Sequence, residues 1–317
     1  MSAIDSNSLD PFICRCLSEG ADETPSLLRL GEVRRDCGAL RKLLLPDSCW
    51  SEFTHWHQQG DEDALHCSMI LLALHRGHLR AVTEPVHRLL MHGQALAPGL
   101  RSQYIQDLRE RWMLDSSPER RNQKARMFRG KLTELQCALW LVESSWVINA
   151  LEAFREGSDL EATDPAGNST AIEVKFVGNE DADFVEILKS IRGERCGRFS
   201  SPYSGVNYLV FRAYECSVQL KSAPAISRRM AILCVDGVAW PTFDLPIANG
   251  WIDWEVPGFL GQDEDWSEFL RHKAQRYPSI VSDLALRLRS LDRVWIVRIE
   301  AGFKLTLVQE PVLRTAE

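Results

Sequence analysis

Apolar side chains in the first third of the chain recur at helical spacing, as in Leu27, Leu30, Val33 and Leu40. Residues 1–25, by contrast, are polar, and Ala97-Pro98-Gly99 interrupts the pattern. We therefore predict an all-helical N-terminal domain over residues 1–112. Its further helices are expected at Ala64–Leu74, Glu84–Met91 and Arg101–Trp112.

After the joint at Asp115–Pro118 the pattern changes from helices alone to helices alternating with short strands. Leu132, Leu135, Leu139 and Val142 form a stripe at i, i+3, i+7 and i+10, which predicts a helix that packs on a sheet. We assign residues 113–248 to this α/β region. Its further elements are a strand at Trp146–Ala150, a hairpin at Asp159–Lys175, a helix at Asp181–Ile191, a strand at Asn207–Phe211, a helix at Tyr214–Ser222 and a strand at Met230–Val235.

The region from Trp240 to Gly261 is rich in Trp, Pro and Gly, which favours an irregular connection. Residues 249–317 are expected to be accessory to the α/β core. Its elements are helices at Asp263–Gln275 and Ser279–Ser290 and a hairpin of Arg293–Ile299 with Phe303–Gln309.

The Asp159–Lys175 hairpin carries the clearest chemical signal. Two strand-like runs flank a turn, Asp164-Pro165-Ala166-Gly167-Asn168. Side chains alternate across a strand, so Glu173 and Lys175 share one face and Val174 faces the other way. Hairpin pairing brings Asp159 beside them, with Glu161 as a reserve candidate on the same face. Two carboxylates that converge at a sheet edge suit Mg²⁺, which keeps room for a substrate phosphate.

These residues resemble the PD-(D/E)XK nuclease superfamily. Asp159 with Glu173-Val174-Lys175 corresponds to its hairpin motif, and Glu134 stands on the preceding helix, where many members carry an acid. The predicted order is αβββαβ, as in the restriction-endonuclease-like core with its mixed central sheet. The match covers roughly residues 120–215 and departs at Ser158, where the motif has proline.

The resemblance implies a metal-dependent nuclease, with DNA favoured as substrate and an endonuclease favoured over an exonuclease. Asp159, Glu173 and the main-chain carbonyl of Val174 would bind Mg²⁺, for which Mn²⁺ would substitute. Glu134 would bind a second metal ion or a metal-bound water. Lys175 would orient or activate the attacking water. If two ions bind, they would clamp both oxygens of an in-line displacement.

The net charge of −7 does not by itself indicate nucleic-acid binding, but the basic residues are unevenly distributed. Six bases stand against one acid between Glu119 and Lys131, directly before Glu134. They could hold a phosphate backbone or form a solvated helix face. The candidate phosphate contacts are Arg120, Arg121, Lys124, Arg126, Arg129 and Lys131, with Lys189 and Arg192 in addition.

Composition excludes several other classes. No apolar run reaches the length of a membrane span. The N-terminus lacks the basic and apolar regions of a signal peptide, so we expect a cytoplasmic protein. The nine cysteines contain no Cys-x-x-Cys pair, which favours reduced thiols. Seven of the eight histidines lie between His55 and His92. Helix-surface histidines are the commoner explanation, with a transition-metal site as the alternative.

Two other functions compete with a nuclease. One is a catalytically weak or inactive nuclease-fold subunit that binds nucleic acid or a partner protein. The other is a phosphodiesterase that acts on a small nucleotide. The N-terminal helical domain suggests a regulatory protein partner. A homodimer would allow two active sites to cut two strands, and the architecture is similar to components of bacterial restriction or anti-phage defence systems.

Overall fold

The structure, a computed structural model, describes residues 118–151, 158–178, 205–223, 227–236, 270–299 and 305–309. These residues fall into two compact units, and the boundary runs between Leu135 and Gln136 within one helix. The predicted N-terminal helices with their histidines, the Asp181–Ile191 helix and the Trp240–Gly261 connection lie outside the described residues. None of the described helices is long and apolar enough to cross a bilayer.

The first described helix, α8, spans Pro118–Glu143 and confirms the predicted core helix. Proline at its first position is favourable because the missing N–H has no partner within a helix anyway. Leu132, Leu135 and Leu139 are almost fully buried, as the apolar stripe predicted. The helix ends where Ser145 takes a left-handed φ of 66°, and the chain then enters the sheet.

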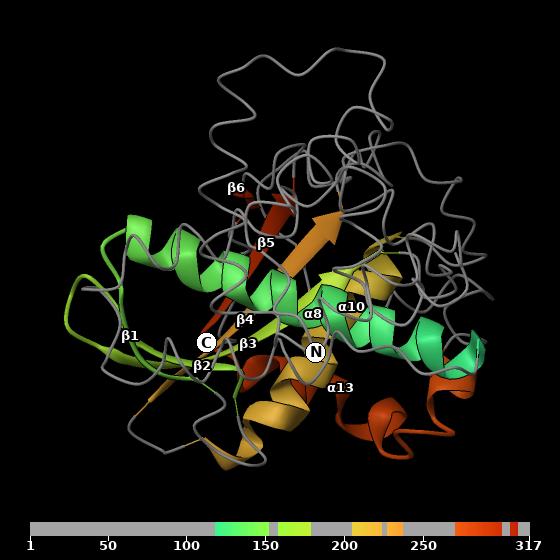
Figure 1. The fold of residues 1–317 in the computed structure, drawn as a ribbon. Coiled ribbons are helices and arrows are strands. Elements are labelled where there is room, and N and C mark those ends of the chain that lie inside the picture. The colour runs from blue at the N-terminus through green and yellow to red at the C-terminus, as the bar shows by residue number, and fades with distance from the viewer. Residues whose placement is uncertain are drawn as a thin grey trace, which may run out of the picture. The chain divides into compact units, whose positions relative to one another are not determined.

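The described strands form a single mixed, curled sheet in the order β1-β2-β3-β4-β5-β6 (Figure 1). The described part of the chain is therefore of the α/β class. Pairing is antiparallel between β1 and β2, β2 and β3, and β5 and β6, and parallel between β3, β4 and β5. The strands are Val147–Leu151 (β1), Leu160–Thr163 (β2), Ser169–Val177 (β3), Arg228–Asp236 (β4), Arg293–Ile299 (β5) and Leu305–Gln309 (β6).

The β2–β3 turn fixes the register of the central hairpin. The Gly167 N–H donates to the Asp164 carbonyl over 2.9 Å, and Gly167 has a φ of 86°, which a residue with a side chain rarely adopts. Oδ1 of Asp164 accepts hydrogen bonds from the main-chain N–H groups of Ala166 and Asn168. Asp164 is therefore a turn residue, as its position in the sequence indicated.

The connection from β3 to β4 contains helix α10, Gly205–Gln219, and this corrects one prediction. Asn207–Phe211 is not a strand but the first half of this helix. Tyr208, Leu209, Val210 and Phe211 are all buried, so the run is apolar on every side, and a short run of that kind does not distinguish strand from helix. The described elements run α8-β1-β2-β3-α10-β4, so α10 and β4 stand where the sequence predicted a helix at Asp181–Ile191 and a strand at Asn207–Phe211.

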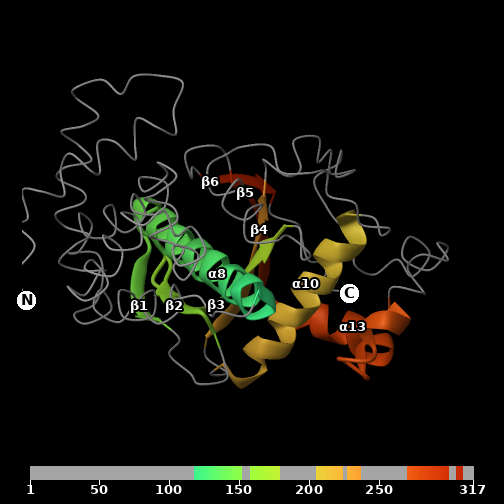
Figure 2. The same ribbon diagram turned by 45° about the vertical axis from the view of Figure 1, so that its right-hand side comes forward.

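Helix α10 covers one face of the sheet. Its buried side chains form one apolar cluster with residues of β3, β4 and β5, including Ala171, Val177 and Leu233. Helix α13, Ile280–Arg289, packs against α10 (Figure 2) and confirms the helix predicted at Ser279–Ser290. The short helix η1, Leu220–Ser222, completes the helical segment predicted to end at Ser222.

The opposite face of the sheet receives the last turns of α8. The Sγ atoms of Cys137 on α8 and Cys234 on β4 lie 3.2 Å apart. The rings of Trp140 and Trp295 meet edge to face, with their centroids 5.4 Å apart. Since Cys234 pairs with Phe176 in register, even-numbered residues of β3 face α8 and odd-numbered residues face α10. The predicted C-terminal hairpin is confirmed as β5 and β6.

Candidate active site

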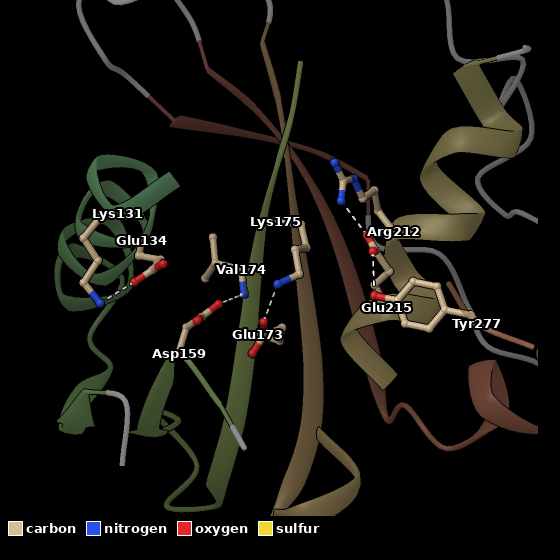
Figure 3. A network of polar contacts seen from close by, with 9 residues as sticks. All are labelled: Lys131, Glu134, Asp159, Glu173, Val174, Lys175, Arg212, Glu215 and Tyr277. Atoms are coloured by element: carbon tan, nitrogen blue, oxygen red, sulfur yellow. Dashed lines mark hydrogen bonds and ion pairs between the residues drawn. The ribbon is translucent and has the colours of Figure 1, made fainter. Parts of the chain in front are cut away.

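The β2–β3 hairpin brings the predicted motif residues of β2 and β3 together on the α10 face of the sheet. Glu173 and Lys175 are odd-numbered residues of β3 and project to that side. The antiparallel register pairs Leu160 with Ile172, which places Asp159, one residue before β2, opposite Glu173. Asp159, Glu173 and Lys175 are thus neighbours, as the sequence predicted (Figure 3).

Asp159 is held in place by the backbone of β3. Its Oδ2 atom accepts a hydrogen bond from the Val174 N–H over 2.8 Å. This contact ties the chain just before β2 to the centre of the motif. The second oxygen, Oδ1, is the atom that Asp159 could present to a cation.

Glu173 is a buried carboxyl group, with 2% of its side chain exposed. Burial and the neighbouring charge of Asp159 raise its pKa to about 8, although the ammonium group of Lys175 opposes that rise. A carboxyl group in this position therefore binds a proton readily. Two carboxyl groups that resist joint ionisation form a pair that a cation can neutralise.

Lys175 forms an ion pair with Glu173, with 2.5 Å between Nζ and Oε1, and 21% of its side chain is exposed. Burial alone would lower the pKa of Lys175, but the negative charge of Glu173 raises it above the ordinary lysine value. Lys175 is therefore protonated at neutral pH. It is also the member of the pair that reaches solvent.

The donor set of Asp159 and Glu173 fits Mg²⁺. Both are hard oxygen ligands, and a magnesium ion is often held by one or two carboxylates with water and substrate phosphate completing its octahedron. Among the residues that the structure describes, no three His, Cys, Asp or Glu side chains are close enough to hold one ion. The carbonyl of Val174 as a third ligand stays a prediction.

Glu134 is on α8 and belongs to the other compact unit. Its Oε2 atom forms an ion pair with Nζ of Lys131 over 2.7 Å, and 13% of its side chain is exposed. The predicted role of Glu134 toward a second metal ion or a metal-bound water stays a prediction.

The basic run before Glu134 divides into surface and interior positions. Arg120 and Arg126 are exposed on α8. Arg129 and Lys131 are buried, with 2% and 1% exposure. The side chains of Arg121 and Lys124, and all of Lys189 and Arg192, lie outside what the structure describes, so the predicted phosphate contacts stay predictions.

A polar network of Arg212, Glu215 and Tyr277 was not predicted from the sequence. The Arg212 Nη1 atom lies 2.5 Å from Glu215 Oε2, and the Tyr277 hydroxyl donates to Glu215 Oε1 over 2.9 Å. This network stands on the same face of the sheet as Lys175 (Figure 3). The i, i+3 spacing of Arg212 and Glu215 is a helical signal, but reading Asn207–Phe211 as a strand concealed it.

Comparisons of the chain with protein-family models, with curated proteins and with solved structures give no match.

Proposed function

We propose that the protein is a metal-dependent nuclease that hydrolyses phosphodiester bonds of nucleic acid, with DNA favoured and Mg²⁺ as the metal. The observation that carries this proposal is the cluster of Asp159, Glu173 and Lys175 at the centre of the β2–β3 hairpin. The αβββαβ order of the described elements supports the restriction-endonuclease-like core of the PD-(D/E)XK superfamily.

In this proposal Asp159 and Glu173 would hold the ion, and Lys175 would contact the substrate phosphate. When bound, Mg²⁺ would supply Lewis-acid polarisation of a phosphoryl oxygen and a lower pKa for a coordinated water. The oxygen of the attacking water forms the new bond to phosphorus, and the water gives up a proton to the solvent. The bond to the leaving 3′ oxygen breaks, and that oxygen takes up a proton.

The resemblance allows Lys175 either to orient the attacking water or to activate it, and the charge of Lys175 favours the first role. In the absence of metal, the charge of Glu173 raises the pKa of Lys175, which favours a protonated ammonium group. An ammonium group donates hydrogen bonds and does not abstract a proton. Lys175 therefore orients the attacking water and offsets the negative charge that develops on the phosphate.

The test is a cleavage assay of the full chain on supercoiled DNA, linear duplex, single-stranded DNA and RNA, with Mg²⁺, with Mn²⁺ and with EDTA. The proposal predicts cutting that needs metal and identifies the substrate by which nucleic acid is cut. Cutting that continues in EDTA would contradict it. An endonuclease would convert supercoiled circles, which have no ends, to open-circular or linear DNA.

The alternative is a nuclease-fold subunit that binds nucleic acid without cutting it. One observation favours this alternative. The carboxylate of Glu134, the third acid of the motif, is already paired with the ammonium group of Lys131. Such a subunit would hold nucleic acid equally well with metal and with chelator. Binding that is independent of metal, together with no cutting of any substrate, would select it.

A further inference from the structure

Arg212 is a cation that two fixed partners hold in one orientation. Its Nη1 atom pairs with Glu215, and its Nη2 atom donates to the Tyr208 hydroxyl over 2.7 Å. The guanidinium carbon also lies 5.0 Å from the centroid of the Tyr208 ring. Tyr277 fixes the second oxygen of Glu215. The guanidinium is therefore already oriented, so little conformational entropy is lost when it binds an anion.

The position of this guanidinium follows from the topology. Since α10 connects two adjacent parallel strands, it runs back along the sheet, opposite to β3. Cys216 is buried in the apolar cluster that α10 forms with β3, together with the odd-numbered Ala171 and Val177 of that strand. Arg212 lies one turn before Cys216 and thus toward the end of β3 at which Lys175 stands. Figure 3 shows Lys175 and Arg212 on the same side of the sheet.

The surroundings of Arg212 carry positive charge. Lys273 Nζ lies 4.7 Å from the centroid of the Phe211 ring, and the Arg276 guanidinium lies 5.5 Å from that of Tyr277. The Phe211 and Tyr277 rings are themselves in contact, with their centroids 5.9 Å apart. In this part of the described chain, Arg212 pairs with Glu215, and Lys273 and Arg276 lie over the neighbouring Phe211 and Tyr277 rings. The cluster suits a phosphate backbone, which carries one charge per nucleotide.

We propose that Arg212 binds a phosphate of the nucleic-acid substrate beside the Glu173–Lys175 pair, and that Glu215 and Tyr208 position its guanidinium for that contact. The inference rests on the proposed function and deepens it by naming a substrate-binding residue outside the hairpin motif. A planar guanidinium donates two parallel hydrogen bonds to one phosphate, whereas an ammonium acts as a point charge. Lys273 and Arg276 add positive charge near it, over the Phe211 and Tyr277 rings.

Three variants of the full chain test this assignment. Arg212→Gln removes the charge, and Arg212→Lys keeps the charge but removes the fork. Arg287→Gln is the matched control, since Arg287 pairs with Asp283 over 3.1 Å and Asp283 binds the Tyr214 hydroxyl. The control thus removes an arginine from a similar Arg–carboxylate–Tyr network, on α13.

Two measurements are made on an oligonucleotide of the cleaved type. The first is kcat and KM in Mg²⁺, and the second is the salt dependence of binding in EDTA by fluorescence anisotropy. We expect Arg212→Gln to lower kcat/KM by about 10- to 100-fold, which is the range for one charged hydrogen bond. Its salt slope should fall by about one phosphate contact, roughly 0.9 for duplex and 0.7 for single strands. Arg212→Lys should keep the wild-type slope and lose about tenfold in kcat/KM. Arg287→Gln should behave as wild type in both measurements.

The inference would be overturned if Arg212→Gln had the kcat/KM and the salt slope of the wild-type protein. The proposed function would still stand in that case, because it depends on cleavage by the wild-type protein. Equal losses in Arg212→Gln and Arg287→Gln would overturn it as well, because they would indicate a structural role alone. If Arg212→Gln does not fold, Arg212→Lys decides, and wild-type kinetics in that variant would refute the contact. A wild-type protein that neither cuts nor binds nucleic acid would remove the proposed function and this inference together.

Discussion

Glu173→Gln should change the pH dependence of stability in the metal-free protein. In the unfolded chain a glutamate has its ordinary pKa of 4.5, whereas burial and the charge of Asp159 raise the folded-state pKa to about 8. The folded state thus holds a proton that the unfolded state has released between these values. Stability is full below pH 4.5 and is lost as the pH rises toward 8.

The size of the effect follows from the shift. One pKa unit corresponds to about 1.4 kcal/mol, so the full window is worth on the order of 3–5 kcal/mol. Glutamine carries no charge at any pH, so Glu173→Gln should gain that much over wild type between pH 4.5 and pH 8.5. The assay is urea denaturation in EDTA at both pH values. Glu143→Gln, which removes an exposed carboxylate at the end of α8, is the control and should show no such gain.

The same urea denaturation experiment is repeated with Mg²⁺ in place of EDTA. An ion that binds only the folded state stabilises it by an amount that grows by about 1.4 kcal/mol for each tenfold excess over its Kd. We expect Mg²⁺ to stabilise wild type at pH 8 and to leave Glu173→Gln almost unchanged. The electrostatic reasoning would be refuted if the difference in free energy of unfolding between wild type and Glu173→Gln stayed constant with pH. Equal stabilisation of both proteins by Mg²⁺ would refute the ligand role of Glu173.

Three further variants test individual residues. Lys175→Ala should leave Mg²⁺ binding largely intact, as followed by calorimetry, and reduce kcat by roughly 10²- to 10⁴-fold; wild-type turnover would remove its role. Asp159→Asn keeps an oxygen for the Val174 N–H, so its melting temperature should stay near that of wild type while cleavage is lost; normal cleavage would show that its charge is not needed. Asp164→Ala removes the acceptor for two main-chain N–H groups in the turn and should cost about 1–3 kcal/mol in urea denaturation without changing the metal requirement; an unchanged free energy of unfolding would show that the turn does not depend on this side chain.

The sequence predicted the hairpin well because its signals are local. The turn residues Asp164 and Gly167 fix the register, and strand alternation then decides which face Glu173 and Lys175 share. The strand at Met230–Val235 was also predicted correctly, since β-branched and apolar residues run through it without a break. Short-range chemistry was sufficient in both places.

Sequence reasoning failed where the outcome depends on tertiary packing. Tyr208–Phe211 are buried on all sides because α10 is covered by the sheet and by α13, and no period distinguishes such a run from a buried strand. The proximity of Tyr277 to Glu215 depends on the packing of separate segments, 62 residues apart in the chain. No local pattern contains that contact.

Cleavage of the preferred nucleic acid by wild type and by Glu173→Gln, compared side by side with Mg²⁺ and with EDTA, tests the central claim most directly. The account predicts cutting by wild type in Mg²⁺ alone and none by the variant, with both proteins folded. Cutting by Glu173→Gln at the wild-type rate would show that the Asp159–Glu173–Lys175 cluster is not the active site.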